Sequence, residues 1–142
     1  MMTPGEKAHI IVHRHMLGKD AFSQWLGIEV LDIRPGYCAL RMTIRTEMLN
    51  GFGIAHGGIA YSLADSALAF ASNSHGIQAV SVETSISHIK PVQVGDTIKA
   101  EAVEKSLTRR LGIYEVTLTN QHDRIIALFK GTVFRKDTVW EV

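Results

Sequence analysis

Alternating apolar and polar positions predict a β-hairpin in the first third of the chain. In the segment Tyr37–Arg45 every second side chain is apolar, which is typical of a strand with one face on a core. The preceding segment Ile28–Arg34 is also β-prone, and Pro35-Gly36 between the two forms a turn. Cys38 falls on the apolar side of the second strand, so we expect a buried packing thiol.

One segment has the pattern of a long buried helix. The run His56–Ser74 contains no proline, is rich in Ala and Leu, and is apolar on nearly all sides, with Gly76 as a stop signal. Shorter helical patterns occur at Gly5–Leu17 and Asp20–Leu26, separated by Gly18. Because the long helix has almost no polar face, we expect other structure to surround it.

The rest of the chain is β-prone and predicts three or four further strands. The runs are Ile77–Ile89, Thr97–Leu107, Gly112–Asn120 and Arg124–Phe134. An antiparallel sheet must cover its apolar face, and the long helix is the only adequate cover. The predicted fold is therefore α+β, an antiparallel sheet wrapped around one long central helix, with a short helical N-terminal segment, in a single domain over residues 1–142. Such a sheet leaves an edge strand that a second copy can cover, so we expect a homodimer or a larger even assembly.

Composition narrows the classes of function. The 142 residues, 46% of them hydrophobic and 20% charged, are enough for a core that needs neither disulfide nor metal. The 15 Lys and Arg against 14 Asp and Glu leave a net charge of +1, which disfavours a nucleic-acid partner. A single cysteine is typical of a reducing compartment, and no segment has the character of a signal peptide or membrane span. We therefore expect a cytoplasmic protein without a membrane partner.

Two features of the long helix suggest chemistry. Asp65 lies in mid-helix on a segment with almost no other charge, where an ionised carboxylate costs stability unless it is paired or faces a cavity. Hydrogen bonds to the hydroxyls of Tyr61 and Ser62 are the structural alternative. Near the helix start, the Gly57-Gly58 pair offers backbone N–H groups that could stabilise an oxyanion, or could be simple turn chemistry. An oxyanion-binding helix end plus an acidic group is the minimum equipment for acyl transfer to water.

The segment Asn50–Asp65, NGFGIAHGGIAYSLAD, resembles the motif of hotdog-fold acyl-CoA thioesterases. It is most similar to the phenylacetate-degradation PaaI type within the 4-hydroxybenzoyl-CoA thioesterase group, and the resemblance covers most of the chain. It implies the hotdog fold and hydrolysis of small acyl-CoA thioesters, with aryl-acetyl groups such as phenylacetyl or hydroxyphenylacetyl favoured. It also implies that coenzyme A enters as part of the substrate, that no separate cofactor is used, and that the chain forms a homodimer, with a homotetramer favoured.

The same resemblance assigns roles to individual residues. It makes Asp65 the catalytic carboxylate and the Gly57 N–H the oxyanion donor, with Asn50 and His56 shaping the pocket and Gly58 beside the substrate. Gly57 and Asp65 are eight positions apart, about 12 Å along one helix, so they must act from different subunits to reach one carbonyl. Whether Asp65 attacks the thioester or removes a proton from water stays open, and a general-base role for His56 is a lesser alternative. No metal site is expected, because no second ligand stands at metal spacing near His56.

A coenzyme A substrate carries phosphates, which need cations at the mouth of the pocket. Arg109 and Arg110, flanked by Lys105, are the best candidates, although a solvated turn explains them equally well. His88 and Lys90 are weaker candidates.

Two other functions are weighed against hydrolysis. The chain could be a noncatalytic acyl-CoA-binding or sensing module, but such a module has no use for a carboxylate like Asp65 on a buried helix. A hydratase or dehydratase would need a different arrangement of His and acid, which the sequence lacks. The sequence leaves the identity of the acyl group open.

Overall fold

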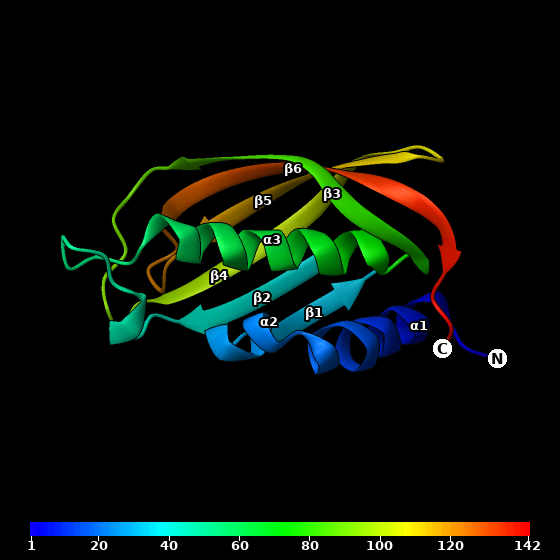
Figure 1. Cartoon of the computed structure of the whole chain (residues 1–142), viewed down its shortest axis with the longest axis horizontal. Coiled ribbons are helices and arrows are strands. Elements are labelled where there is room, and N and C mark those ends of the chain that lie inside the picture. The colour runs from blue at the N-terminus through cyan, green and yellow to red at the C-terminus, as the bar shows by residue number, and fades with distance from the viewer.

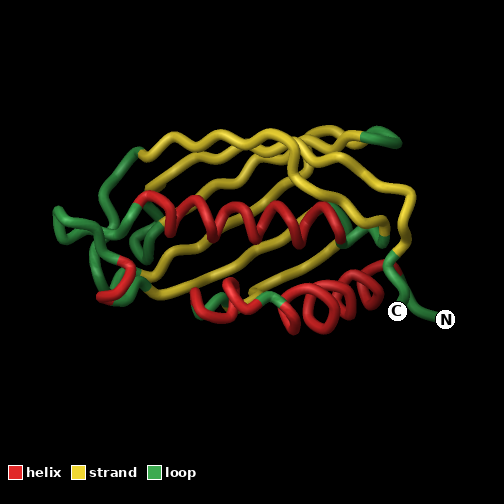
Figure 2. Tube along the Cα trace, in the orientation of Figure 1, coloured by secondary structure: helices red, strands yellow, loops and turns green.

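The computed structural model describes the whole chain, residues 1–142, and has one helix in the hollow of a curved sheet. Helix α3 (Gly57–Asn73) lies lengthwise along the concave face (Figures 1 and 2). The strands are β1 (Glu29–Arg34), β2 (Tyr37–Thr43), β3 (Ile77–His88), β4 (Thr97–Leu107), β5 (Leu111–Thr119) and β6 (Ile125–Val139). They form one sheet in the order β1-β2-β4-β5-β6-β3, and all neighbours are antiparallel. The predicted hotdog architecture is confirmed.

The N-terminal segment is helical, as predicted, but Gly18 does not interrupt it. Helix α1 (Pro4–Ile10) continues into the π-helical turns of η1 (Ile11–Met16) and the 3₁₀ turn η2 (Leu17–Lys19). Asp20 then caps α2 (Ala21–Leu26), which ends at Gly27 with a φ of 76°. The whole segment packs along β1 and α3 (Figure 1).

The β1–β2 hairpin follows the predicted alternation. Cys38, Leu40 and Met42 are buried on the core face of β2, and burial raises the pKa of the Cys38 thiol well above its usual range. Cys38 is therefore a packing residue, as expected. Ala39 departs from the pattern, because it lies on the other face and is nevertheless buried.

Helix α3 is less completely surrounded than its sequence predicts. His56 caps its start and Ser74 its end. Ile59, Leu63, Ala67 and other side chains on most of its circumference are buried against the sheet, whereas Ala60, Tyr61, Asp65 and Ala69 are only half-buried. One long side of the helix therefore stays partly open in the single chain, and Asp65 lies on it.

Strand β6 runs five residues past the predicted end at Phe134. This extension, residues 135–139, is mostly polar, so it has no hydrophobic alternation to reveal it. It forms because the first residues of β3 need backbone partners, and Ile77 pairs with Val139. Just beyond it, the indole N–H of Trp140 donates to Asn73 Oδ1 at 2.9 Å, which ties the C-terminus to the end of α3.

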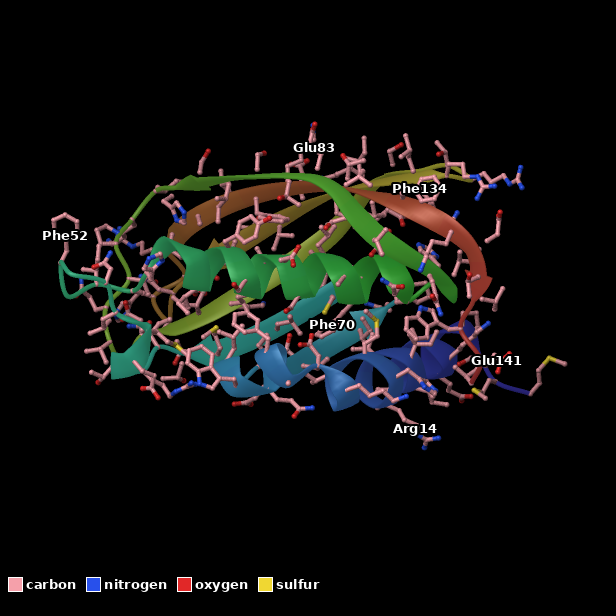
Figure 3. All side chains as sticks on the ribbon, in the orientation of Figure 1. Arg14, Phe52, Phe70, Glu83, Phe134 and Glu141 are labelled. Carbon is pink, nitrogen blue, oxygen red and sulfur yellow. The ribbon has the colours of Figure 1, made fainter.

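The sheet has two free edges, β1 and β3. Strand β3 is the longer of the two and carries exposed Val80 and Val82. Glu83 on β3 and Phe134 on the neighbouring β6 point away from α3 on the convex face (Figure 3). A long, exposed edge with apolar side chains is suited to pairing with another chain.

Close packing between α3 and the sheet gives a stability prediction at Gly131. A Cβ on this residue of β6 would lie 2.5 Å from Leu68 Cδ2 of α3 and 3.2 Å from the Phe129 ring. Because these side chains are buried, we expect Gly131→Ala to lower the free energy of unfolding by about 1–3 kcal/mol. Chemical denaturation measures it. Gly51→Ala, where a Cβ meets nothing within 4 Å, is the control and should change stability little. Equal stability of the two variants would contradict this packing argument.

Candidate active site

The start of α3 presents an unused hydrogen-bond donor. His56 caps the helix, and its Nδ1 accepts the Gly58 N–H at 3.1 Å. An Nδ1 that accepts cannot carry a proton, so the neutral ring carries its proton on Nε2. The Gly57 N–H donates to nothing in the chain, because it lies in the first helical turn and the cap serves its neighbour. A free amide at the positive end of the helix dipole suits a developing oxyanion.

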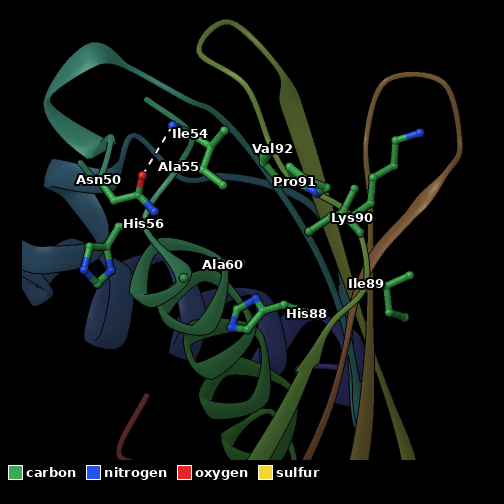
Figure 4. Close-up of a pocket in the computed structure, with 12 residues that line it drawn as sticks. Asn50, Ile54, Ala55, His56, Ala60, His88, Ile89, Lys90, Pro91 and Val92 are labelled. Atoms are coloured by element: carbon green, nitrogen blue, oxygen red, sulfur yellow. Dashed lines mark hydrogen bonds between the residues drawn. The ribbon is translucent and has the colours of Figure 1, made fainter. Parts of the chain in front are cut away.

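Asn50 is held so that its amide nitrogen is also free. Its Oδ1 accepts backbone N–H groups from Phe52 at 2.9 Å and Ile54 at 3.4 Å, which turns the loop before α3. The dashed line in Figure 4 marks the second of these bonds. With the oxygen engaged by the loop, the amide N–H groups of Asn50 remain available as donors.

These donors line a pocket of about 260 Å³ at the start of the helix. It brings together five residues singled out in the sequence: Asn50, His56, Gly57, His88 and Lys90. Figure 4 shows Asn50 and His56 on the α3 side, with His88 at the end of β3 and Lys90 just beyond it. The remaining walls are mostly apolar and comprise Ile54, Ala55, Ala60, Ile89, Pro91, Val92 and Ile126. The pocket therefore joins apolar walls to amide donors and a lysine.

Gly57 leaves room for His88. A Cβ on Gly57 would lie 3.1 Å from His88 Nε2 and 3.3 Å from its Cε1, so the imidazole rests against the helix start. A side chain at position 57 would push against this ring and cover the free amide. The glycine is thus explained by close approach.

Asp65 does not line this pocket. It borders a second pocket of about 410 Å³, on the open side of α3, which Ser81 of β3 and Lys136 of β6 also line. Its carboxylate has no hydrogen-bond or ion-pair partner: the Tyr61 hydroxyl pairs with Thr84, and the Ser62 hydroxyl donates to the Gly58 carbonyl at 2.7 Å. The structural alternative, in which those two hydroxyls bind Asp65, is therefore wrong.

The environment of Asp65 disfavours its charged form. Burial raises the pKa of the Asp65 carboxyl, and the nearby carboxylate of Asp20 raises it further. An unpaired, half-buried acid on a cavity wall is a candidate for a functional carboxylate.

Arg109 and Arg110 lie away from the Gly57 pocket of their own chain. They form the turn between β4 and β5, which Figure 1 shows at the end of the molecule where α3 ends. Arg110 makes a two-pronged contact with Asp137, at 2.8 and 3.1 Å, whereas the Arg109 side chain is 82% exposed. Within one chain, the cations beside the pocket are therefore Lys90 and, when protonated, His88.

The apolar walls are the part of the site that the sequence did not single out. Val92 lies in the connection between β3 and β4, and Ile126 lies on β6, far from the motif in sequence. Pairing of β3 with β6 brings them together, and no local pattern reports that pairing. No group of three or more His, Cys, Asp or Glu side chains in the chain is arranged to hold a metal ion. No helix is long and apolar enough to cross a membrane.

The raised pKa of Asp65 predicts that its charge destabilises the fold. A carboxyl that holds its proton more tightly when folded favours folding at low pH, and this advantage is lost as the pH rises through the folded pKa. We expect Asp65→Asn to raise the free energy of unfolding at pH 7 by about 0.5–2 kcal/mol, the size common for single stabilising substitutions. Denaturation at equal protein concentration measures it, and the gain over the wild type should shrink towards pH 3. A less stable variant at pH 7 would show that the Asp65 carboxylate has a stabilising partner.

Known proteins are similar to this chain in both fold and sequence. Residues 52–127 match the model of the thioesterase superfamily. The acyl-coenzyme A thioesterase PaaI of Escherichia coli is 37% identical over 84% of this chain and 86% of its own length. The structure of the E. coli PaaI protein from the phenylacetic acid degradation operon superposes with a TM-score of 0.93, covering 96% of this chain and 99% of that one at 34% identity.

Two further proteins are similar to this chain in sequence or in structure. A putative esterase of Archaeoglobus fulgidus is 39% identical over 87% of this chain and 80% of its own. A Streptococcus mutans protein, solved bound to acetyl-CoA, has a TM-score of 0.77 and 26% identity, covering 80% of this chain and 91% of that one. The family match and the similarity to PaaI confirm the expected thioester hydrolase: the chain belongs to the thioesterase superfamily.

Proposed function

We propose that the protein hydrolyses acyl-CoA thioesters at a site shared between two subunits. The observation that carries this proposal is the placement of two complementary groups on one helix. The free Gly57 amide and the unpaired Asp65 carboxylate line different pockets and stand about 12 Å apart along α3. Neither half suffices alone, so a second subunit supplies the missing group.

The chemistry follows from the two halves. The thioester carbonyl oxygen accepts the Gly57 N–H, with the Asn50 amide as a second donor, and its developing negative charge is stabilised there. Asp65 of the other subunit either attacks the carbonyl carbon or takes a proton from the water that does so. In both cases the C–S bond breaks, the sulfur leaves as coenzyme A, and water supplies the oxygen of the free acid.

His56 serves as a cap in this scheme. Its Nδ1 is engaged by the Gly58 N–H, so accepting a proton there would release the start of α3. This favours the pocket-shaping role over the general base.

The two sides of the pocket have the chemical character that coenzyme A and an aryl-acetyl group require. Lys90 and His88 stand at the β3 end, where they could meet phosphate oxygens. The acyl-CoA substrate is supported by the relative named as an acyl-coenzyme A thioesterase and by the structure solved with acetyl-CoA. The aryl-acetyl preference is supported by the apolar walls and by the operon of the E. coli relative.

The second subunit is proposed to pair along the β3 edge. Two β3 strands related by a two-fold axis run antiparallel, so the His88 end of one lies near the Ile77 end of the other. The Arg109-Arg110 turn stands at the latter end (Figure 1). In such a homodimer these arginines could reach phosphates bound at the partner's pocket, which keeps them as candidates. Two dimers would then build the favoured homotetramer.

The expected compartment is the cytoplasm. Its support is the single, buried, unbridged Cys38, which suits a reducing environment.

A noncatalytic acyl-CoA-binding module is the second candidate. The carboxylate of Asp65 argues against it, because a binding protein gains nothing from a charge that burial and Asp20 both disfavour.

A thiol-release assay over a panel of acyl-CoA thioesters tests the reaction and the acyl group together. We expect phenylacetyl-type thioesters to be hydrolysed fastest. Asp65→Asn should keep the fold and lose at least about 10²-fold in turnover, the scale expected for a base or nucleophile. Asp32→Asn, which neutralises an exposed carboxylate on β1, is the matched control. Turnover of Asp65→Asn within threefold of the wild type would exclude Asp65 from the mechanism.

Mixed oligomers test the shared site. Gly57→Val covers the oxyanion amide, and Asp65→Asn removes the acid, so each homo-oligomer should be inactive. After reversible dissociation, hybrid dimers should hold one intact and one doubly damaged site, and activity should return to about half that of the wild type per hybrid. The measurement is activity against subunit ratio, with hybrids quantified by native mass spectrometry. Hybrids that form but stay inactive would place both groups within one chain.

A further inference from the structure

A chain of hydrogen bonds leads from the N-terminal segment to the residue beside Asp65. Asp20, the cap of α2, accepts the Ser23 N–H on Oδ1 at 2.9 Å and the Ser23 hydroxyl on Oδ2 at 2.6 Å. The Ser23 and Ser66 hydroxyl oxygens lie 2.8 Å apart. Ser23 is fully buried and Ser66 is 9% exposed, so this chain is sealed between α2 and α3.

The direction of the protons in this chain is fixed. An ionised carboxylate only accepts, so the single Ser23 hydroxyl hydrogen goes to Asp20. Ser66 must therefore donate to Ser23. The hydroxyl of Ser66 is thus committed to α2, whereas Asp65, the preceding residue of the helix, faces a different direction and lines the pocket on the open side of α3.

The charges around Asp65 are few, and Asp20 is the one acid among them. Lys136 of β6 lines the same pocket. His15 of η1 lies beside Trp140, with 6.2 Å between the ring centroids, and Trp140 also lines this pocket. Strand β3 contributes only uncharged residues to this pocket, and α3 contributes no ionisable group besides Asp65. Asp20 is also the only charged residue that perturbs the pKa of Asp65, raising it by repulsion between like charges.

We propose that Asp20 is a positioning residue of the active site, which acts on Asp65 through its negative charge and through the Ser23–Ser66 hydroxyl chain. The inference rests on the proposed catalytic role of Asp65. The like charge makes the ionised Asp65 a stronger base, which speeds either proton removal from water or attack on the thioester. The hydroxyl chain fixes the turn of α3 that carries Asp65 against α2.

The pH dependence of hydrolysis distinguishes this role from a purely structural one. Removing the Asp20 charge lowers the pKa of Asp65, so the acid limb of kcat/KM should move to lower pH. The rate on the plateau should fall about two- to tenfold, because a weaker base is less reactive. Asp20→Asn and Asp20→Ser both keep a good cap, so α2 should be retained in both. Asp32→Asn, which removes an exposed charge, should leave the limb in place.

Ser23→Ala separates the hydroxyl chain from the charge. It breaks the link to Ser66 and keeps the Asp20 carboxylate, so the plateau rate should fall while the acid limb stays near that of the wild type. The Asp65 carboxyl can also be titrated directly by ¹³C NMR on protein labelled at aspartate, with its signal assigned by its loss in Asp65→Asn. This titration needs no turnover.

The outcomes are separable. An Asp65 signal and an acid limb that stay unmoved in folded Asp20→Asn and Asp20→Ser, while Asp65→Asn is inactive, would overturn this inference and leave the proposed function standing. An active Asp65→Asn would overturn the catalytic role of Asp65, whatever the titration shows. A shifted signal and a shifted limb in both Asp20 variants support the inference.

Discussion

The burial of α3 in the hollow of the sheet is the constraint on which the rest of the structure depends. The helix covers most of the concave apolar face, and the N-terminal segment covers the part beside β1, so the position and direction of α3 are fixed along its whole length. Its first amide is consequently held at one end of the sheet, beside the β3–β4 connection, while Asp65 is held two turns away on the open side. A rigid helix cannot bring these groups together, and the proposal of a site shared between two subunits rests on this rigidity.

The same burial determines the character of Asp65. The neighbouring hydroxyls are engaged elsewhere, Tyr61 with Thr84 and Ser66 with Ser23. The carboxylate thus lies at the wall of a cavity without the hydrogen bonds that usually accompany a buried charge. Such a group lowers stability, and the proposed catalytic role of Asp65 explains why it is nevertheless there. The Gly57 N–H is the second unpaired polar group of α3, because it lies in the first helical turn and has no acceptor in the chain.

Local sequence patterns predicted what local physics decides. Strand β4 has the predicted bounds at both ends, and α3 differs by one residue at each end, because alternation, capping residues and Gly76 act within a few positions. Five of the predicted residues line the Gly57 pocket. Asn50, His56 and Gly57 lie in the loop before α3 or at its first residue, and His88 and Lys90 lie at the end of β3 or just beyond it. What depends on distant pairing could not be predicted: the polar end of β6 is a strand because Ile77 needs a partner, and Ile126 reaches the pocket through the β3–β6 pairing. The lack of a partner for Asp65 likewise depends on Thr84 of β3, because its hydroxyl pairs with the hydroxyl of Tyr61.

The N-terminal segment extends this argument beyond the sheet and its central helix. Its sequence predicts only amphipathic helix, which by itself would serve to cover apolar surface. In the structure, however, a cap residue that any short helix could use also directs a buried hydroxyl chain towards the turn of α3 that carries Asp65. Ordinary capping chemistry places a negative charge near a second carboxylate, an arrangement that costs stability and that the proposed mechanism uses. The segment therefore covers apolar surface with its buried Ala8, Val12 and Leu26, and in the proposed mechanism its cap residue is also part of the environment of Asp65. An uncharged cap would serve the covering role equally well.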